Sequence, residues 1–96
     1  MWNDYPDELY ISNLIENGFM GKTYTDYKPI KVRYIKGYEK IENEGTKRVK
    51  TYHFPFSPNN TDKLKDAFGN NLRITDIKPC RGPIGSKVHF WKVVVE

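Results

Sequence analysis

The sequence predicts an α+β fold: a single small domain spanning residues 1–96, with a mostly antiparallel sheet of about four strands and two helices. A chain of 96 residues fits one hydrophobic core and leaves no room for a second. Two segments combine helix-start residues with apolar residues at spacings of three and four, whereas the segment between them alternates apolar and polar residues as strands do. The expected order along the chain is α-(β)-β-β-α-β-β, with both helices on one face of the sheet.

The first expected helix covers residues 6–17. Pro6 suits the first turn of a helix, and Asp7 and Glu8 complement the positive end of the helix dipole. Apolar residues then follow at helical spacing: Leu9, Tyr10, Ile11, Leu14 and Ile15. Gly18 is the expected stop, because the residue after a helix commonly takes a left-handed conformation.

A long hairpin at residues 30–56 is the organising element of this prediction, after a short possible strand at residues 22–27. Its alternation of apolar and charged residues slips near Ile35, which predicts a bulge or bend at residues 35–37. Residues 42–45 form the expected turn and end on a glycine. The expected cross-strand pairs are Ile41 with Thr46, Glu39 with Arg48, and Ile35 with Tyr52.

The second expected helix runs to residue 68. Asn60 or Thr61 caps its start, and Gly69 stops it. The remaining expected elements are a strand at residues 72–78, a loop at residues 79–86 and a final strand at residues 87–95. The three consecutive valines near the end of that last strand indicate burial on both of its faces.

Cysteine usage and hydropathy indicate where in the cell the protein is expected. Cys80 is the single cysteine, so the chain cannot form an internal disulfide and must be stabilised by packing, which suits a reducing cytosol. No basic segment followed by an apolar run stands at the N-terminus, and no apolar stretch approaches the roughly 18 residues of a membrane span. We therefore expect a cytoplasmic protein, in the host cytoplasm if a phage encodes it, without a membrane partner.

The charge of the chain is divided by position. Residues 1–20 contain four acids and no Lys or Arg, whereas residues 21–96 contain all sixteen basic residues against eight acids. The net charge of +4 therefore combines a basic body with an acidic N-terminal segment. A basic body attracts polyanions, which favours nucleic acid, DNA or RNA, as a partner.

The first functional hypothesis is a non-catalytic module that contacts nucleic acid, or a complex containing nucleic acid, through the hairpin. Basic side chains that alternate with rings on a sheet can hold phosphates while the rings stack on bases. The candidate residues are Lys31, Arg33, Lys36, Lys47, Arg48, Lys50, Arg81 and Lys87 for phosphates, with Tyr34, Tyr38 and Tyr52 for bases. The alternative for these lysines is a solvated edge strand, on which lysine prevents sheet-to-sheet aggregation.

The second hypothesis is a protein-binding inhibitor or adaptor from a phage or mobile element. Such a protein could block a host nucleic-acid enzyme, for example as an anti-CRISPR-type counter-defence protein. The acidic N-terminal segment carries Trp2, Tyr5 and Tyr10 as candidate anchors for a protein partner, because aromatic residues are enriched in interface hot spots. Oligomeric state and the identity of a partner do not follow from these residues.

No motif indicates a reaction. Residues 80–86 contain glycine, serine and arginine but lack the Gly-Lys-Ser/Thr ending of a nucleotide-binding loop. Asp76 and Lys78 match half of a metal-dependent nuclease site, but Asp7, the other half, is far away in sequence. Cys80 has no local signature of a nucleophile, and two histidines with one cysteine do not complete a closed zinc site. We therefore expect no enzyme activity, no metal and no cofactor.

Overall fold

A computed structural model describes residues 5–19, 21–43, 45–81 and 88–96, and these residues form strands and turns but no helix. The strands are β1 (Asp7–Ser12), β2 (Leu14–Gly18), β3 (Gly21–Tyr24), β4 (Lys28–Glu42), β5 (Gly45–Phe54), β6 (Lys63–Lys65), β7 (Asn71–Arg81) and β8 (Val88–Val95). The α+β prediction with two helices is therefore wrong. The antiparallel pairing that it expected is present throughout.

Six of the strands form a closed barrel in the order β1-β4-β5-β8-β7-β6, and β6 pairs with β1 to close it. Two three-stranded meanders build it, because β1, β4 and β5 are neighbours, as are β6, β7 and β8. The centre is filled by apolar side chains from all six strands: Leu9, Ile11, Val32, Tyr52, Phe54, Leu64, Ile74, Val93 and Val95. Closure leaves this part of the sheet without an exposed edge.

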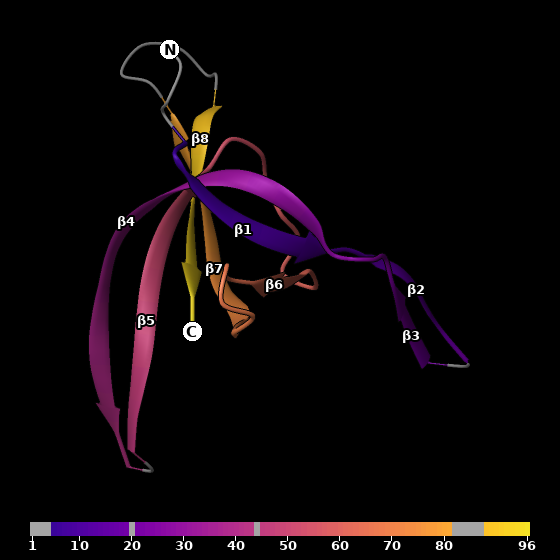
Figure 1. Ribbon diagram of the computed structural model, residues 1–96, viewed down its shortest axis with the longest axis horizontal. Coiled ribbons are helices and arrows are strands. Elements are labelled where there is room, and N and C mark those ends of the chain that lie inside the picture. Colours follow the sequence, from indigo (N-terminus) through magenta and orange to yellow (C-terminus); the bar gives the residue numbers. More distant parts are fainter. Residues whose placement is uncertain (1–4, 20, 44, 82–87) are drawn as a thin grey trace.

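Two hairpins project from the barrel as arms (Figure 1). The first, here called the hairpin arm, consists of residues 35–42 of β4 and 45–49 of β5. In this arm the two strands pair only with each other. The pairing of β4 with β1 ends at Val32, and the pairing of β5 with β8 begins at Lys50. The second, here called the short arm, consists of β2 and β3. A backbone hydrogen bond closes its base, since Thr25 N donates to Asn13 O at 2.9 Å.

The segment expected as the first helix instead forms β1 and β2. Leu9 and Ile11 are both buried, which is the two-residue period of a strand. Leu9 lies opposite Ile30 of β4, and Ile11 lies opposite Leu64 of β6. Ile15, which a helical stripe would bury, is 65% exposed on the short arm. The short apolar run fits both periods, and pairing on both sides of β1 favours the strand.

The segment expected as the second helix instead forms β6 and a turn. Leu64 is buried in the core, while Phe68 is 90% exposed, so the expected apolar face does not exist. The Asp66 carboxylate accepts hydrogen bonds from the backbone N of Phe68 and of Asn70, both at 2.9 Å, and from Asn70 Nδ2 at 3.0 Å. Asp66 thus closes a turn in place of a helical one, and Gly69 (φ 85°) supplies its left-handed residue.

The long hairpin was predicted correctly in most details. Ile41 lies opposite Thr46 and Glu39 opposite Arg48, as expected. The register shifts between Tyr34 and Lys36, so the predicted bulge is confirmed. That shift places Tyr34, rather than Ile35, opposite Tyr52, because a bulge adds one residue to one strand.

The expected strands at residues 22–27, 72–78 and 87–95 correspond to β3, β7 and β8. β7 is longer than predicted and includes Pro79 and Cys80, while most of the expected loop lies outside the described residues. Val93 and Val95 are fully buried, but Val94 is only half-buried. The described part of the chain contains no helix with the length and hydropathy needed to span a bilayer.

Candidate nucleic-acid interface

The predicted cations of the hairpin lie on two different faces. Residues directly opposite each other in an antiparallel pair point to the same side of the sheet. Arg48 is opposite Glu39 and Lys50 is opposite Gly37, on the side that continues the barrel interior. Lys36 is opposite Thr51, on the outer side, where Lys31 and Arg33 also lie by register. The hairpin cations therefore do not form one continuous field.

Several of these cations pair with acids near the hairpin tip. Lys47 Nζ lies 3.3 Å from Glu42, and Lys40 Nζ lies 3.7 Å from the same carboxylate. Arg48 lies 4.0 Å from Glu39. Both strands of the hairpin arm are edges, so for Lys36 and Lys40, which do not line the hollows described below, the structure favours the edge-protecting role over a phosphate track.

The three predicted stacking tyrosines have different environments. Tyr52 is 6% exposed and belongs to the core, and burial, together with the charges of Asp66 and Asp7 and the adjacent Tyr34, raises its pKa. Tyr34 meets Tyr52 edge to face at 5.5 Å between ring centroids. A Cβ at Gly37 would lie 2.6 Å from the Tyr34 hydroxyl, so that ring rests over the glycine. Tyr38 is exposed on the hairpin arm.

The other predicted residues are dispersed. Lys31 lies 3.7 Å from Glu8 on the outer wall of the barrel. Arg81 is exposed at the end of β7, and Tyr10 is half-buried on the outer side of β1. Tyr5 lines a separate hollow near the start of β8. Trp2 and Lys87 lie outside the described residues.

A different set of cations lines two adjoining hollows between the arms. One hollow, of about 530 Å³, lies beside the hairpin arm, and the other, of about 550 Å³, lies beside the short arm. Both are lined by Asn71, Leu72 and Arg73 at the start of β7, and the two hollows together are here called the basic groove. Its basic residues are Lys22, Lys47, Arg48, Lys50, Lys63, Lys65 and Arg73.

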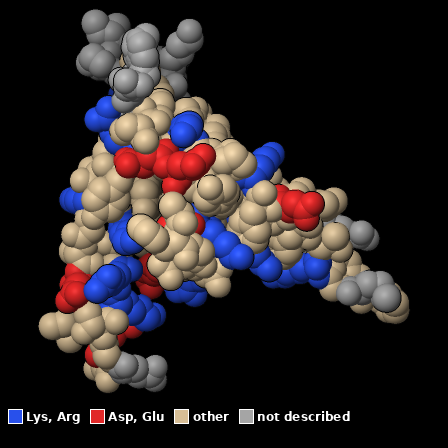
Figure 2. Space-filling model, viewed as in Figure 1, with Lys and Arg blue, Asp and Glu red and all other residues tan. Residues whose placement is uncertain are grey.

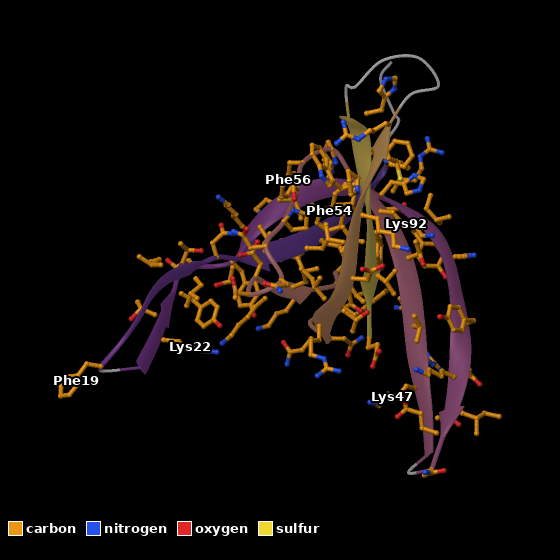
Figure 3. The ribbon with its side chains drawn as sticks, turned by 180° about the vertical axis from the view of Figure 1, so that it is seen from behind. Phe19, Lys22, Lys47, Phe54, Phe56 and Lys92 are labelled. Atoms are coloured by element: carbon orange, nitrogen blue, oxygen red, sulfur yellow. The ribbon has the colours of Figure 1, made fainter. Side chains whose placement is uncertain are left out.

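The basic groove carries the net charge of the protein. Its described lining holds seven of the sixteen basic residues but three of the twelve acids, and the rest of the chain holds nine of each. A band of Lys and Arg atoms extends from the hairpin arm to the short arm (Figure 2). Seen from behind, Lys22 and Lys47 point from their arms toward the space between them (Figure 3). Segments distant in sequence thus build one positive field.

Two lysines of the basic groove are held over tyrosine rings. Lys63 Nζ lies 4.0 Å from the centroid of the Tyr24 ring, and Lys65 Nζ lies 4.5 Å from that of Tyr27. All four side chains line the same hollow. Cation–π contacts restrict the lysines, so their ammonium groups lose less rotamer freedom when they bind an anion.

The three acids of the basic groove have defined partners. Burial alone would raise the pKa of Asp66, but its hydrogen bonds from Asn70 and Phe68 and the charge of Lys50 outweigh burial and lower it. Glu96 lies 3.6 Å from Arg73 and 3.7 Å from Lys47. Asp62 is buried, and its Oδ2 accepts a hydrogen bond from Asn59 N at 2.9 Å. The acids therefore anchor the walls of the basic groove.

Sequence reasoning found Lys47, Arg48 and Lys50 but missed the other four cations of the basic groove. Lys63 and Lys65 were hidden by the helix assignment, although Lys63-Leu64-Lys65 alternates as a strand does. Arg73 comes from β7, which pairs with β6 in the closed sheet, and Lys22 comes from β3, in the separate two-stranded sheet of the short arm.

Among the described residues, no three His, Cys, Asp or Glu side chains gather closely enough to hold a metal ion. No protein-family model, curated protein or solved structure matched the chain.

Proposed function

We propose that the protein is a non-catalytic module that binds single-stranded nucleic acid along the basic groove. The observation that supports this best is that the lining of the basic groove accounts for the whole net charge of +4. Lysines and arginines on four separate segments bind successive phosphates, and the tyrosines beneath Lys63 and Lys65 offer ring surface to bases. This proposal moves the interface from the outer end of the hairpin to the space between the arms.

Salt dependence tests this proposal. Binding of a fluorescent single-stranded oligonucleotide is measured by anisotropy across a range of salt concentrations. Neutralising about four phosphates is expected to give a slope of log affinity against log salt of about −3, since each single-strand phosphate contributes about −0.7. A slope near zero would show that these cations do not contact phosphates.

A second candidate function is binding to a protein partner through the arm tips, and one observation favours it. Phe19 at the tip of the short arm is 100% exposed (Figure 3). Ile41 near the tip of the hairpin arm is 86% exposed. Exposed apolar side chains at projecting tips are typical of contacts with another protein. This candidate retains the inhibitor or adaptor hypothesis, with different anchor residues.

Capture from a host lysate, with and without nuclease treatment, separates the two functions. A partner held by the arm tips stays bound after digestion and is lost when Phe19 and Ile41 are both replaced by serine. Loss of every partner after digestion contradicts the tip-mediated function and agrees with the basic groove.

A further inference from the structure

A row of basic side chains crosses four strands on the outer face of the barrel. Arg33 of β4 lies opposite His53 of β5, His53 lies opposite Lys92 of β8, and Lys92 lies opposite Lys78 of β7. Directly opposite residues point to the same side and have Cβ atoms about 5 Å apart. Because Tyr52 and Val93, the neighbours of His53 and Lys92 in the chain, point into the core, this row points outward. Lys92 is labelled beside β8 in Figure 3.

Lys92 and Lys78 lie directly opposite each other, and like charges in that position repel. Among the described residues, neither Lys78 nor Lys92 has an acid within 4 Å. Burial, followed by the charges of Arg33 and Lys92, lowers the pKa of His53. The neighbours of His53 on both adjacent strands therefore oppose its protonation, and an anion would reverse that effect.

A hollow of about 520 Å³ adjoins one end of this row. It is lined by Tyr5, Arg33, Ile35, His53, His89 and Phe90. The His53 and Phe90 rings are 4.1 Å apart between centroids, with an angle of 33° between their planes. One side of the hollow is thus cationic, while aromatic and aliphatic side chains make up much of the rest. Its size lies within the range of about 300–1,000 Å³ that is usual for small-molecule sites.

We propose that this hollow binds a nucleoside phosphate. Its phosphate contacts Arg33 and His53, which line the hollow, and Lys92, which lies beside it opposite His53. Its base packs against Phe90 and Tyr5, since planar rings stack on aromatic side chains. A free nucleotide and the 5′-phosphorylated end of a strand present this same chemistry.

The nucleotide site is separate from the basic groove and does not rest on the function proposed for it. Phe90 lies near the start of β8, whereas Val95, which lines the basic groove, ends that strand. Five residues of extended chain separate them by about 17 Å. Loss of binding at one surface therefore leaves the other intact, and the two proposals fail independently.

The test follows the His53 imidazole by NMR during titration with adenosine 5′-monophosphate. The pKa of His53 is expected to rise on saturation, because a phosphate beside the imidazole favours its protonated form. The charged groups that face His53 are Arg33 of β4 and Lys92 of β8, and His89 lines the same hollow. An unchanged pKa at millimolar nucleotide overturns the proposal, as does equal affinity for inorganic phosphate, which lacks the base.

A matched pair of variants locates the phosphate. Lys92→Gln is expected to weaken the nucleotide about tenfold, since it removes a charge-assisted contact. Lys40→Gln makes the same charge change on the outer side of the hairpin arm and should leave affinity within twofold. Equal effects of the two variants would overturn the proposal.

Two oligonucleotides that differ only in a 5′-phosphate distinguish a strand end from a free nucleotide as the ligand. Tighter binding of the phosphorylated one, lost in Lys92→Gln but kept in Lys40→Gln, supports a strand end. Equal binding of both, with adenosine 5′-monophosphate still bound, supports a free nucleotide.

Discussion

Replacing Lys50, Lys63 and Arg73 together by glutamine is expected to weaken binding of a single-stranded oligonucleotide about a hundredfold at low salt. The three residues come from β5, β6 and β7 and line both halves of the basic groove. A hydrogen bond to a charged group is worth about 1.5–3 kcal/mol, and exposure to water reduces this to about 1 kcal/mol for each contact. Three contacts therefore account for about 3 kcal/mol. Fluorescence anisotropy measures the change.

The control for this variant removes the same charge from another surface. Lys31, Lys36 and Lys40 lie on the outer side of β4, away from the basic groove, and their replacement by glutamine lowers the net charge equally. If attraction depended on net charge alone, both variants would lose affinity to the same degree. The structure predicts a change of less than about threefold for the control, because long-range attraction is screened beyond about 10 Å at 0.1 M salt. Equal losses contradict the basic groove as the interface.

Phe54→Ala is expected to lower the free energy of unfolding by about 3–5 kcal/mol. The Phe54 side chain is 0% exposed at the centre of the barrel and meets Phe56 edge to face at 5.5 Å. Removing its ring loses the transfer free energy of the ring and leaves a cavity that a closed sheet cannot collapse to fill. A domain of this size has a total stability of only about 5–14 kcal/mol. Chemical denaturation of both proteins gives the difference.

Phe68→Ala is the matched control, since Phe68 is 90% exposed in the turn after β6. Its replacement is expected to change the free energy of unfolding by less than about 0.5 kcal/mol. In a fold with the expected second helix, Phe68 would face the core and its loss would cost as much as that of Phe54. A large effect at Phe68 therefore contradicts the observed course of residues 61–70.

The hairpin could be predicted from the sequence because its information is local. Its bulge and the register of its outer part follow from three local features, without reference to the rest of the chain. These are the alternation of charged and apolar residues, the break in that alternation beside Gly37, and the turn that ends on a glycine. Gly45 has a φ of 128°, as the turn requires. The predicted partners Glu39 and Arg48 are found opposite each other for that reason.

The helices were predicted wrongly because their segments are strands only in the context of the barrel. β1 has its apolar pair, Leu9 and Ile11, two residues apart, and that pair also fits a helical stripe when Leu14 and Ile15 follow. β6 spans three residues, and an alternation that short does not distinguish a strand from a helix. Pairing of β1 with β4 and β6 decides between the periods, and that pairing is a long-range property.

The sequence predicted that the candidate interface is basic but did not predict its position. The sequence indicates a basic body, and the structure concentrates the excess charge in the basic groove. A one-residue bulge determines which hairpin cations share a face, so Lys36 and Lys50 lie on opposite sides. The contributions of Lys22 and Arg73 depend on how the short arm and β7 meet beside β6.

The most direct measurement is an NMR titration of the labelled protein with a single-stranded oligonucleotide, read at each backbone amide. Binding in the space between the two arms predicts the largest shifts at Leu72, Arg73, Lys50 and Lys65, with little change at Lys31 or Lys36. Shifts confined to the outer wall of β4, or none at any concentration that anisotropy reports as saturating, would contradict it.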